Sequence, residues 1–271
     1  MITSPARPRK LRSLLNVTVA LAAVAAVLGA APRAAAAEPP PAAHRAAAVR
    51  PFAGEPPRAL YGSENRTMPT RRRVVALTFN AAWNTEGIPS VLGTLRRRGA
   101  PATFFLTGDF AVRHPGAARG LAEAGHGIGN HSYSHPYFAR LRPAQRAAEV
   151  LAADTALRTA AGTEPLPFFR FPYGETTPRQ IAEVNALGFA DIEFTTDTNG
   201  YLGREGGMTV REAVRRAVAA LRPGAVIQMH VGTAAGQGAV LDALALPRII
   251  DAVRARGYEI TDLRSLLRGA R

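Results

Sequence analysis

Two histidines four residues apart, His131 and His135, are the residues whose types and spacing most clearly suggest chemistry. They enclose a short polar segment that follows an apolar run, which is typical of a loop after a strand. Neutral imidazole is the commonest metal ligand, and two imidazoles leave room for a carboxylate and a water. The pair therefore indicates a divalent metal site, and zinc is the ion we expect.

Other polar residues also follow short apolar runs, and each could reach the same place. They are Asn80, Arg170, Asp197 and His230. If the strands close into a ring, residues dispersed in the sequence converge at one mouth. The first of them is unexpected, because a hydrolytic metal site should present carboxylates where this chain has Asn80 and Ala81.

Strand-like and helix-like segments alternate from Arg71 onward, which indicates a parallel sheet with helices outside it. The expected strands are 74–79, 102–106, 127–129, 168–171, 189–195, 225–229 and 258–260. The expected helices are 88–98, 115–124, 143–160, 177–188, 209–221 and 241–256. A barrel and an open doubly wound sheet both fit this alternation. The spread of polar residues over several strand ends favours the barrel, and no glycine fingerprint for a nucleotide follows the first strand.

Five motifs strengthen this interpretation, since they occur in the order and approximate spacing of the motifs of polysaccharide deacetylases. They are Val75–Phe79, His131–His135, Arg170–Tyr173, Thr196–Tyr201 and Gln228–His230. From about residue 71 to 267, the chain resembles this family, which is carbohydrate esterase family four. The resemblance implies an α/β fold, a distorted seven-stranded (β/α) barrel.

The resemblance also implies metal-assisted removal of acetyl groups from N- or O-acetylated sugars. It assigns His131 and His135 as ligands of a divalent ion that polarises the acetyl carbonyl and activates a water. In the same scheme Arg170 orients a carboxylate base, the backbone N–H of Tyr173 helps to bind the oxyanion, and His230 protonates the leaving group.

Three positions depart from the family pattern. Asn80 and Ala81 stand where the family has an Asp base followed by an Asp metal ligand. An amide is no base at neutral pH, and a methyl group binds no metal. Gly200 stands where the family usually has the Asp that supports the acid histidine, although Asp197 of the same motif is retained. The binding residues are therefore better preserved than the catalytic carboxylates.

Asp197 is the best candidate for a substitute carboxylate, because its motif lies at the expected mouth. Three other loop carboxylates are weaker candidates, with solvation as their ordinary role: Glu86, Asp109 and Glu175. Asn80 could still offer its amide oxygen to a metal or to a sugar. The expected substrate contacts are Trp83, Pro172 and Tyr201, since flat apolar side chains at a mouth suit sugar rings.

The N-terminal residues indicate export. Residues 1–37 combine basic residues, an apolar run and small residues, as a secretory signal peptide does. The alternative is an uncleaved membrane anchor, because the apolar run approaches the ~20 residues that span a bilayer. Residues 38–70 read as an Ala- and Pro-rich linker, and residues 71–271 as the catalytic domain. We therefore expect a secreted or cell-envelope protein.

The charge and the cysteine content of the chain limit the partners and metal ligands that we expect. The formal net charge of +14 falls to +9 without the five basic residues of the leader. The excess is scattered arginine with no basic stripe interleaved with aromatics, so we expect no nucleic-acid partner. The absence of cysteine excludes disulfides and Cys-ligated zinc.

The sequence thus predicts a deacetylase-like hydrolase that acts on an acetylated carbohydrate polymer or oligosaccharide, with a weakly held or absent divalent metal. The alternative is a catalytically silent glycan-binding protein on the same barrel. A third interpretation, a basic structural protein that adheres to the cell wall, depends on charge alone.

Overall fold

The structure is a computed structural model that describes residues 56–234 and 238–268 of the 271-residue chain. The expected leader, residues 1–37, and the first part of the expected linker lie outside the described residues. In the two described ranges, no helix is both long and apolar enough to cross a membrane.

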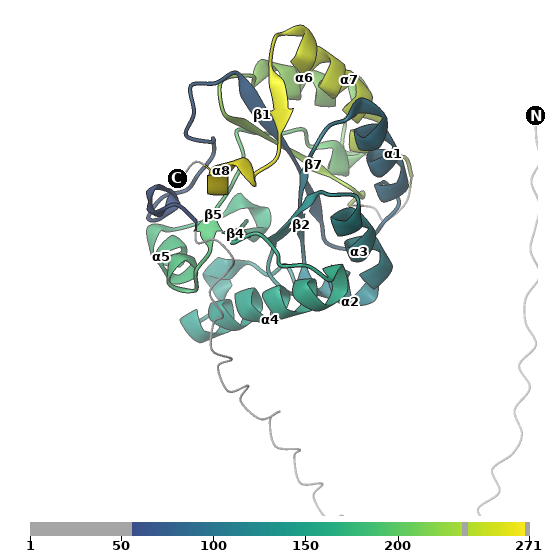
Figure 1. The fold of residues 1–271 in the computed structure, drawn as a ribbon. Coiled ribbons are helices and arrows are strands. Elements are labelled where there is room, and N and C mark those ends of the chain that lie inside the picture. Colours follow the sequence, from purple (N-terminus) through teal and green to yellow (C-terminus); the bar gives the residue numbers. More distant parts are fainter. Residues whose placement is uncertain (1–55, 235–237, 269–271) are drawn as a thin grey trace, which may run out of the picture. The chain divides into compact units, whose positions relative to one another are not determined.

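Parallel strands of the described chain form one curled sheet at the centre of the domain (Figure 1). They are β1 (Val74–Ala81), β2 (Thr103–Leu106), β3 (Gly127–Asn130), β4 (Phe168–Phe169), β5 (Ala190–Asp191), β6 (Thr196–Asp197), β7 (Ala225–His230) and β8 (Glu259–Thr261). Their order is β5-β4-β3-β2-β1-β7-β6, and β8 pairs with the start of β1. The expected distorted barrel is confirmed. The expected strand 189–195 is replaced by two very short strands, β5 and β6; in the described residues the curled path holds seven strands, and β8 pairs with β1 off this path.

The strand register brings polar strand ends side by side. Asn80 near the end of β1 pairs with Phe105 of β2 on one side and with His230 of β7 on the other. Asn130 ends β3 between β2 and β4, so His131 follows at the same edge. The site residues therefore gather at the carboxyl ends of the strands, as in other (β/α) barrels.

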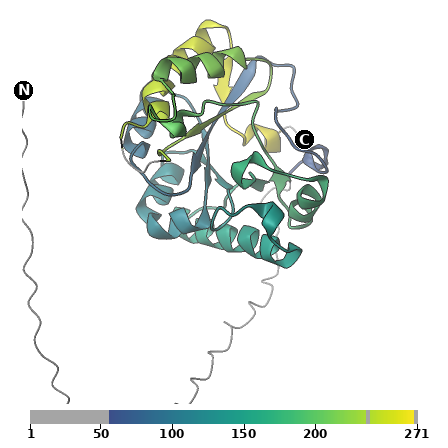
Figure 2. The same ribbon diagram turned by 180° about the vertical axis from the view of Figure 1, so that it is seen from behind.

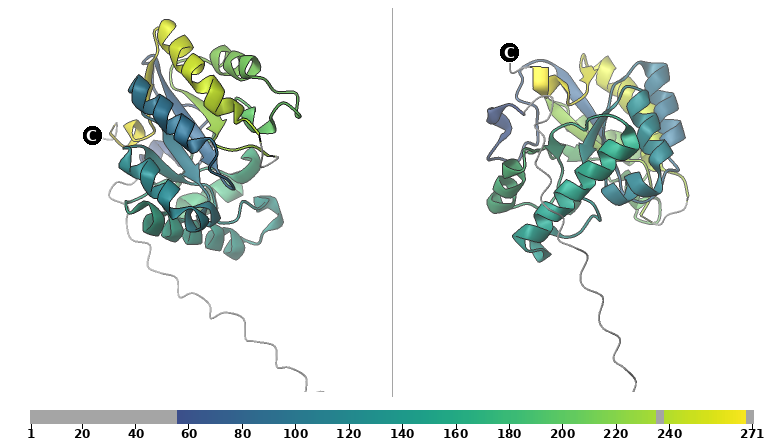
Figure 3. Two further views of the ribbon diagram at one scale, coloured as in Figure 1. Left: turned by 90° about the vertical axis from the view of Figure 1, so that its right-hand side faces the viewer. Right: turned by 60° about the horizontal axis from the view of Figure 1, so that its bottom comes forward.

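Helices surround the sheet (Figures 1 and 2). They are α1 (Ile88–Arg98), α2 (Gly108–Arg113), α3 (Pro115–Glu123), α4 (Pro143–Ala161), α5 (Pro178–Ala186), α6 (Val210–Ala219), α7 (Leu241–Ala255) and α8 (Ser265–Arg268). Helix α7 packs between α1 and α6, and the long helix α4 crosses another side of the domain (Figure 3). The sequence did not predict α2, whose six residues are too few for a periodic pattern and which begins at the side-chain cap of Thr107.

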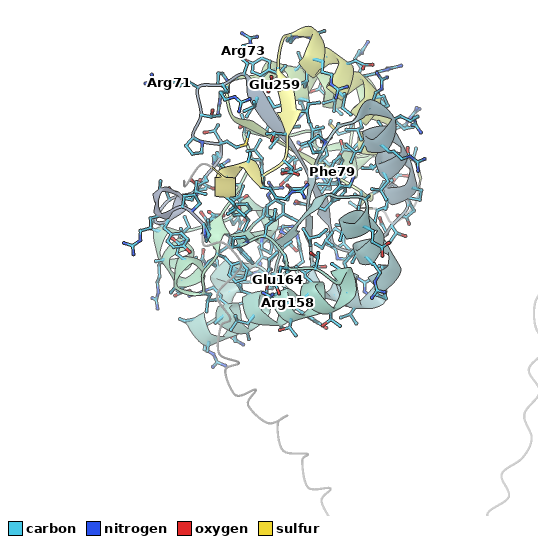
Figure 4. The ribbon with its side chains drawn as sticks, viewed as in Figure 1. Arg71, Arg73, Phe79, Arg158, Glu164 and Glu259 are labelled. Atoms are coloured by element: carbon cyan, nitrogen blue, oxygen red, sulfur yellow. The ribbon has the colours of Figure 1, made fainter. Side chains whose placement is uncertain are left out.

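Strand β1 is the centre of the core, and all eight of its residues are buried. Such burial needs cover on both faces, as in other parallel sheets. Phe79 lies inside the domain (labelled in Figure 4). Towards the helices, it stacks on Phe104 with ring centroids 4.9 Å apart. Phe105 and Phe168 belong to a second apolar cluster. Strand β1 is thus fixed from both sides where it delivers Asn80 to the site.

Residues 56–70, which we expected in the linker, pack against the sheet. Leu60 and Met68 are buried, with 1% and 4% of their surface exposed. Asn65 forms a bridge with Ile192, just after β5, and the chain two residues later forms a bridge with Ala225 at the start of β7. This segment connects the chain after β5, at one end of the sheet, with the start of β7, so the folded domain begins before Arg71.

We expect Leu60→Ala to lower the free energy of unfolding by about 2–5 kcal/mol, because it removes buried methyl groups and leaves a cavity. The matched control is Leu244→Ala on α7, whose leucine is 51% exposed, and its expected effect is within about 0.5 kcal/mol. Urea unfolding at equilibrium measures both. Equal effects of the two substitutions would contradict the packing of residues 56–70.

Candidate functional site

A cavity of about 140 Å³ lies at the carboxyl ends of the central strands. Eight expected site residues line it: Asn80, Trp83, His131, His135, Tyr173, Asp197, Tyr201 and His230. Arg170 lies underneath, completely buried and hydrogen-bonded to Asn80. Pro172, an expected substrate contact, is buried and does not line the cavity. The structure therefore brings nearly all of the predicted residues to one place.

The loop that carries the two histidines is held by side chains on both sides of it. Asn130 at the end of β3 accepts a hydrogen bond from the backbone N–H of Ser132 at 2.9 Å. Glu149 of α4 accepts from the N–H groups of Tyr133 and Ser134 at 2.9 and 2.8 Å. The position of the loop is thus fixed by the strand before it and by a helix that comes later in the chain.

His131 has a defined tautomer. Its Nδ1 lies 2.8 Å from the carbonyl oxygen of Arg170, and a carbonyl can only accept, so Nδ1 carries the hydrogen and Nε2 is unprotonated. Burial, and next the neighbouring His135, holds the pKa of His131 well below its usual value. Burial, with a smaller effect of His230, lowers the pKa of His135 to about 4. Both imidazoles are neutral at physiological pH, which suits metal ligation.

Backbone strain is concentrated in the motif loops. Among the described residues, four non-glycine residues have positive φ, and all four belong to the motifs: Ser132, His135, Tyr173 and Asn199. Such conformations cost of order 1 kcal/mol or more each and persist only where the surroundings enforce them. The motif loops around the cavity therefore adopt their shape at a cost in folding stability.

Arg170 forms the floor of the site. Its Nη1 donates to Thr78 Oγ1 and to Asn80 Oδ1 at 3.1 and 3.0 Å. Its Nε and Nη2 donate to the carbonyl oxygens of Ile192 and Glu193 at 2.9 and 3.1 Å. The guanidinium thus joins β1, β4 and the chain after β5.

One face of this guanidinium rests on the ring of Phe105, with 4.0 Å from the guanidinium carbon to the ring centroid. Glycine at position 129 makes this stacking possible, because a Cβ there would come within 2.7 Å of the Phe105 ring. Burial lowers the pKa of Arg170 to about 10, although the charge of Glu193 acts in the opposite direction. Arg170 is therefore still a cation at neutral pH.

Two carboxyl groups beside Arg170 were not expected from the sequence. Asp191 and Glu193 have no exposed surface, and Glu193 accepts a hydrogen bond from the N–H of Phe171 at 2.9 Å. Burial, and next the charge of Glu193, raises the pKa of Asp191 well above its usual value. Burial also raises the pKa of Glu193, against the effect of Arg170. Negative charge near Arg170 thus comes from Glu193, then Asp197 and Asp191, since Asn80 supplies none.

The amide of Asn80 belongs to a chain of hydrogen bonds along the cavity wall. Asn80 accepts from Arg170 and donates from Nδ2 to Gln228 Oε1 at 3.2 Å. Gln228 in turn donates to Asp197 Oδ2 at 2.8 Å. Gln228 was not expected as a site residue, although it lies two residues before His230 and so on the same face of β7. Asp197 is thus linked to Asn80 through the amide of Gln228.

His230 has acidic groups on two sides. Its Nδ1 lies 3.8 Å from Asp197 and 3.7 Å from Asp242, which is too long for a hydrogen bond but close enough for a strong charge interaction. Burial lowers the pKa of His230, but the charge of Asp197 and then that of Asp242 outweigh it and raise the pKa above its usual value. Tyr201 covers the imidazole, with ring centroids 4.5 Å apart. This arrangement suits a proton donor.

Aromatic rings form the rim next to the histidine pair. Trp83 and Tyr173 each meet the His135 ring edge to face, at 5.3 and 4.6 Å between centroids. Tyr137 stacks flat on Tyr173 at 3.9 Å. Trp83 is 52% exposed and Tyr173 is 49% exposed, so both rings are open to a ligand. An exposed aromatic rim above a polar floor fits a sugar ring.

The weaker candidate carboxylates do not reach the cavity. Asp109 pairs with Arg113 one turn later on α2, and Arg113 also donates to the carbonyl of Trp83. Glu86 and Glu175 are exposed and do not line the cavity. Of the carboxylates considered at the sequence level, Asp197 is the one among the lining residues.

Comparison with known proteins agrees with this geometry. The family profile for polysaccharide deacetylases matches residues 67–192. A chitooligosaccharide deacetylase of Bradyrhizobium sp. (strain ANU 289) is 34% identical over 202 residues, which cover 72% of this chain and 90% of the relative. The chain belongs to the polysaccharide deacetylase family. A peptidoglycan-N-acetylglucosamine deacetylase of Bacillus cereus is 31% identical over 73% of this chain and 70% of the relative.

Solved structures of the same family share the fold. The Bc1960 peptidoglycan N-acetylglucosamine deacetylase superimposes with a TM-score of 0.69 and 28% identity, over 76% of this chain and 92% of that one. A family pseudoenzyme from Bacillus anthracis superimposes with a TM-score of 0.68 over 76% of this chain and 69% of that one. At 23% identity, the second likeness shows the fold alone.

A polysaccharide deacetylase uses a divalent metal, and the donors here fit such an ion incompletely. Nε2 of His131 is unprotonated, and Nδ1 of His135 is buried without a hydrogen-bond partner, so two imidazoles are available. The third place is taken by the methyl group of Ala81, which lines the cavity. In residues 56–234 and 238–268, no three His, Asp or Glu side chains are grouped to hold a metal. The donor set is therefore one ligand short of a catalytic zinc site.

We expect Ala81→Asp to raise the affinity for zinc by at least about tenfold, a gain of about 1.4 kcal/mol, because it supplies the missing carboxylate. Ala82→Asp is the matched control, since it adds the same charge one residue away in the same cavity wall. Competition with a chromophoric chelator measures both affinities. A gain that is equal in the two variants would show a general effect of charge and would contradict the assigned ligand position.

The buried carboxyl groups of Asp191 and Glu193 should make the stability of the fold depend on pH. Because the pKa of Asp191 is raised above 3.8 in the folded chain, the folded state keeps a proton that the unfolded state releases. This contribution to stability is complete at low pH and is lost as pH rises through the folded pKa. We therefore expect Asp191→Asn to gain stability relative to the natural protein as pH rises from about 4 to 7.

Urea unfolding across this pH range measures the difference, with Glu86→Gln as the control for removal of an exposed carboxylate. A stability difference between Asp191→Asn and the natural protein that does not change with pH would contradict the raised pKa of Asp191 in the folded chain.

Proposed function

We propose that this polysaccharide deacetylase homologue takes an acetylated carbohydrate in the cavity and binds it much better than it hydrolyses it. The observation that carries the proposal is the Arg170–Asn80 hydrogen bond at 3.0 Å. It keeps the floor of the site assembled around position 80, but with an amide where the family has its base. The site is organised for its ligand and lacks the group that would remove a proton from water.

The residues that remain support recognition of an acetylated sugar. Trp83 is exposed at the rim, Tyr173 is half-exposed with Tyr137 stacked on one face, and Tyr201 lies over His230. We assign N-acetylglucosamine oligomers as the substrate class, since relatives are named for deacetylating chitooligosaccharides and peptidoglycan N-acetylglucosamine.

The proposed chemistry follows from the protonation of each group. His230, with its raised pKa, donates a proton to the leaving amine, and the backbone N–H of Tyr173 stabilises negative charge on the acetyl oxygen. Asn80 is neutral and takes no proton from the attacking water, so this proton passes to solvent without a general base at position 80. Loss of a general base typically slows such a reaction by about 10²- to 10⁴-fold.

The second candidate function is glycan binding with no hydrolysis at all. It is favoured by the incomplete donor set for a metal in the described residues, because Ala81 offers no ligand. The two candidates share the ligand and the cavity and differ in the rate of acetate release.

We also propose that the protein works outside the cytoplasm, at the cell envelope or beyond it. The support is the signal-peptide pattern of residues 1–37 and the polymeric nature of the substrate class.

Restoring both carboxylates is the direct test. We expect Asn80→Asp combined with Ala81→Asp to raise zinc-dependent acetate release from chitin oligosaccharides by about 10²- to 10⁴-fold, because base and ligand return together. The matched control is Ala82→Asp combined with Asn84→Asp, which adds the same charge to the same wall of the cavity. If the two double variants release acetate equally, the account of position 80 is wrong.

A further inference from the structure

A third carboxylate, Asp242, reaches the site from α7. It lies in the first turn of that helix, and its side chain has no exposed surface. Its Oδ1 accepts a hydrogen bond from the hydroxyl of Thr198 at 2.6 Å, and its Oδ2 accepts from the backbone N–H of His230 at 2.8 Å. The same Oδ2 lies 3.7 Å from Nδ1 of the His230 ring. Asp242 thus contacts both the backbone and the side chain of one site residue.

The carboxylate of Asp242 fills the space that a side chain at position 200 would need. A Cβ added to Gly200 would lie 2.2 Å from Asp242 Oδ1 and 2.4 Å from its carboxyl carbon. No real contact of that kind is tolerated, so the carboxylate of Asp242 and a side chain at position 200 are mutually exclusive. Backbone strain does not explain the glycine, because the φ of Gly200 is not positive.

We propose that Asp242 is the positioning residue for His230, and that it supplies from α7 the carboxylate that position 200 lacks. Its bond to the His230 N–H fixes the end of β7, and its charge beside Nδ1 directs that nitrogen away from the cavity. Nε2 is then the nitrogen that meets the ligand. The inference rests on the proposed function only in taking His230 as the proton donor.

Other charged groups around His230 do not position it as Asp242 does. Asp197 approaches the same Nδ1 at 3.8 Å, but its Oδ2 is bound by Gln228 and its Oδ1 by the N–H of Asn199. Arg170, which acts on the imidazole with the opposite sign, is fixed by its own partners. Asp242 differs from both because it also holds the backbone of His230.

A stability cycle tests the shared space. We expect Gly200→Ala to lower the melting temperature by about 5 °C, as overpacking by a methyl group does in a domain of this size. In the Asp242→Ala background, we expect the same substitution to cost less than half as much, because the carboxylate is gone. Equal costs in the two backgrounds would overturn the claim that position 200 and Asp242 compete for one space.

Moving the carboxylate from position 242 to position 200 tests whether Asp242 positions His230. NMR titration of the His230 imidazole, assigned by its loss in His230→Ala, should show a lower pKa in Asp242→Ala. The pKa of His230 should return toward its natural value in Gly200→Asp combined with Asp242→Ala, because this double variant supplies the carboxylate from position 200 in place of position 242. Asp251→Asn on the exposed side of α7 is the control and should leave the titration unchanged.

An unchanged pKa of His230 in Asp242→Ala, in a protein whose circular dichroism spectrum is intact, would overturn the proposal. Lack of rescue by the exchange would overturn the claim about position 200. Neither readout requires acetate release, so failure of the proposed function and failure of this inference give different results.

Discussion

The buried guanidinium of Arg170 is the constraint on which the rest of the site depends. A cation taken fully out of water is costly unless its N–H groups are bonded and its charge is balanced. Its bonds to Thr78 and Asn80 tie down β1, and its bonds to two carbonyl groups tie down the chain after β5. Its own carbonyl sets the tautomer of His131. One residue therefore links the floor of the cavity to the histidine pair.

The balance of charge around this guanidinium explains how the site tolerates an amide at position 80. Asn80 satisfies one N–H of Arg170 with a neutral oxygen, and the carboxyl groups of Glu193, Asp197 and Asp191 supply negative charge nearby. The floor keeps its geometry while the base is absent. A similar replacement occurs at His230. Position 200 is glycine, and Asp242 places a carboxylate beside the imidazole. At two of the three motif positions that lack a carboxylate, 80 and 200, a buried carboxylate lies near the charged group that the missing one would face.

The sequence predicted the elements and the gathering of the motifs because both depend on local patterns. Alternating βα segments fix the direction of every strand, so residues at strand ends such as His131 and His230 must meet at one edge. The resemblance to the family then named their roles. The same reasoning identified Asn80 and Ala81 as departures, and the structure places both in the cavity wall.

What the sequence did not predict depends on contacts between distant segments. Asp242 reads as an ordinary acidic residue in the first turn of a helix, and its burial against Gly200 appears only when α7 packs beside β7. Glu193 lies in a strand-like run, and the sequence does not show which side of it is buried. The packing of Leu60 and Met68 was missed because the segment lacks periodicity and bridges the sheet by isolated pairs. Helix α2 was too short to show a period.

The central claim is that the cavity recognises an acetylated sugar although its hydrolytic carboxylates are missing. Calorimetric titration of the natural protein with N-acetylated chitotetraose, and separately with the fully deacetylated tetramer, tests it most directly. The account predicts saturable binding of the acetylated ligand, much weaker binding of the deacetylated one, and acetate near background during the titration. Equal binding of both ligands, no binding of either, or rapid release of acetate would contradict it.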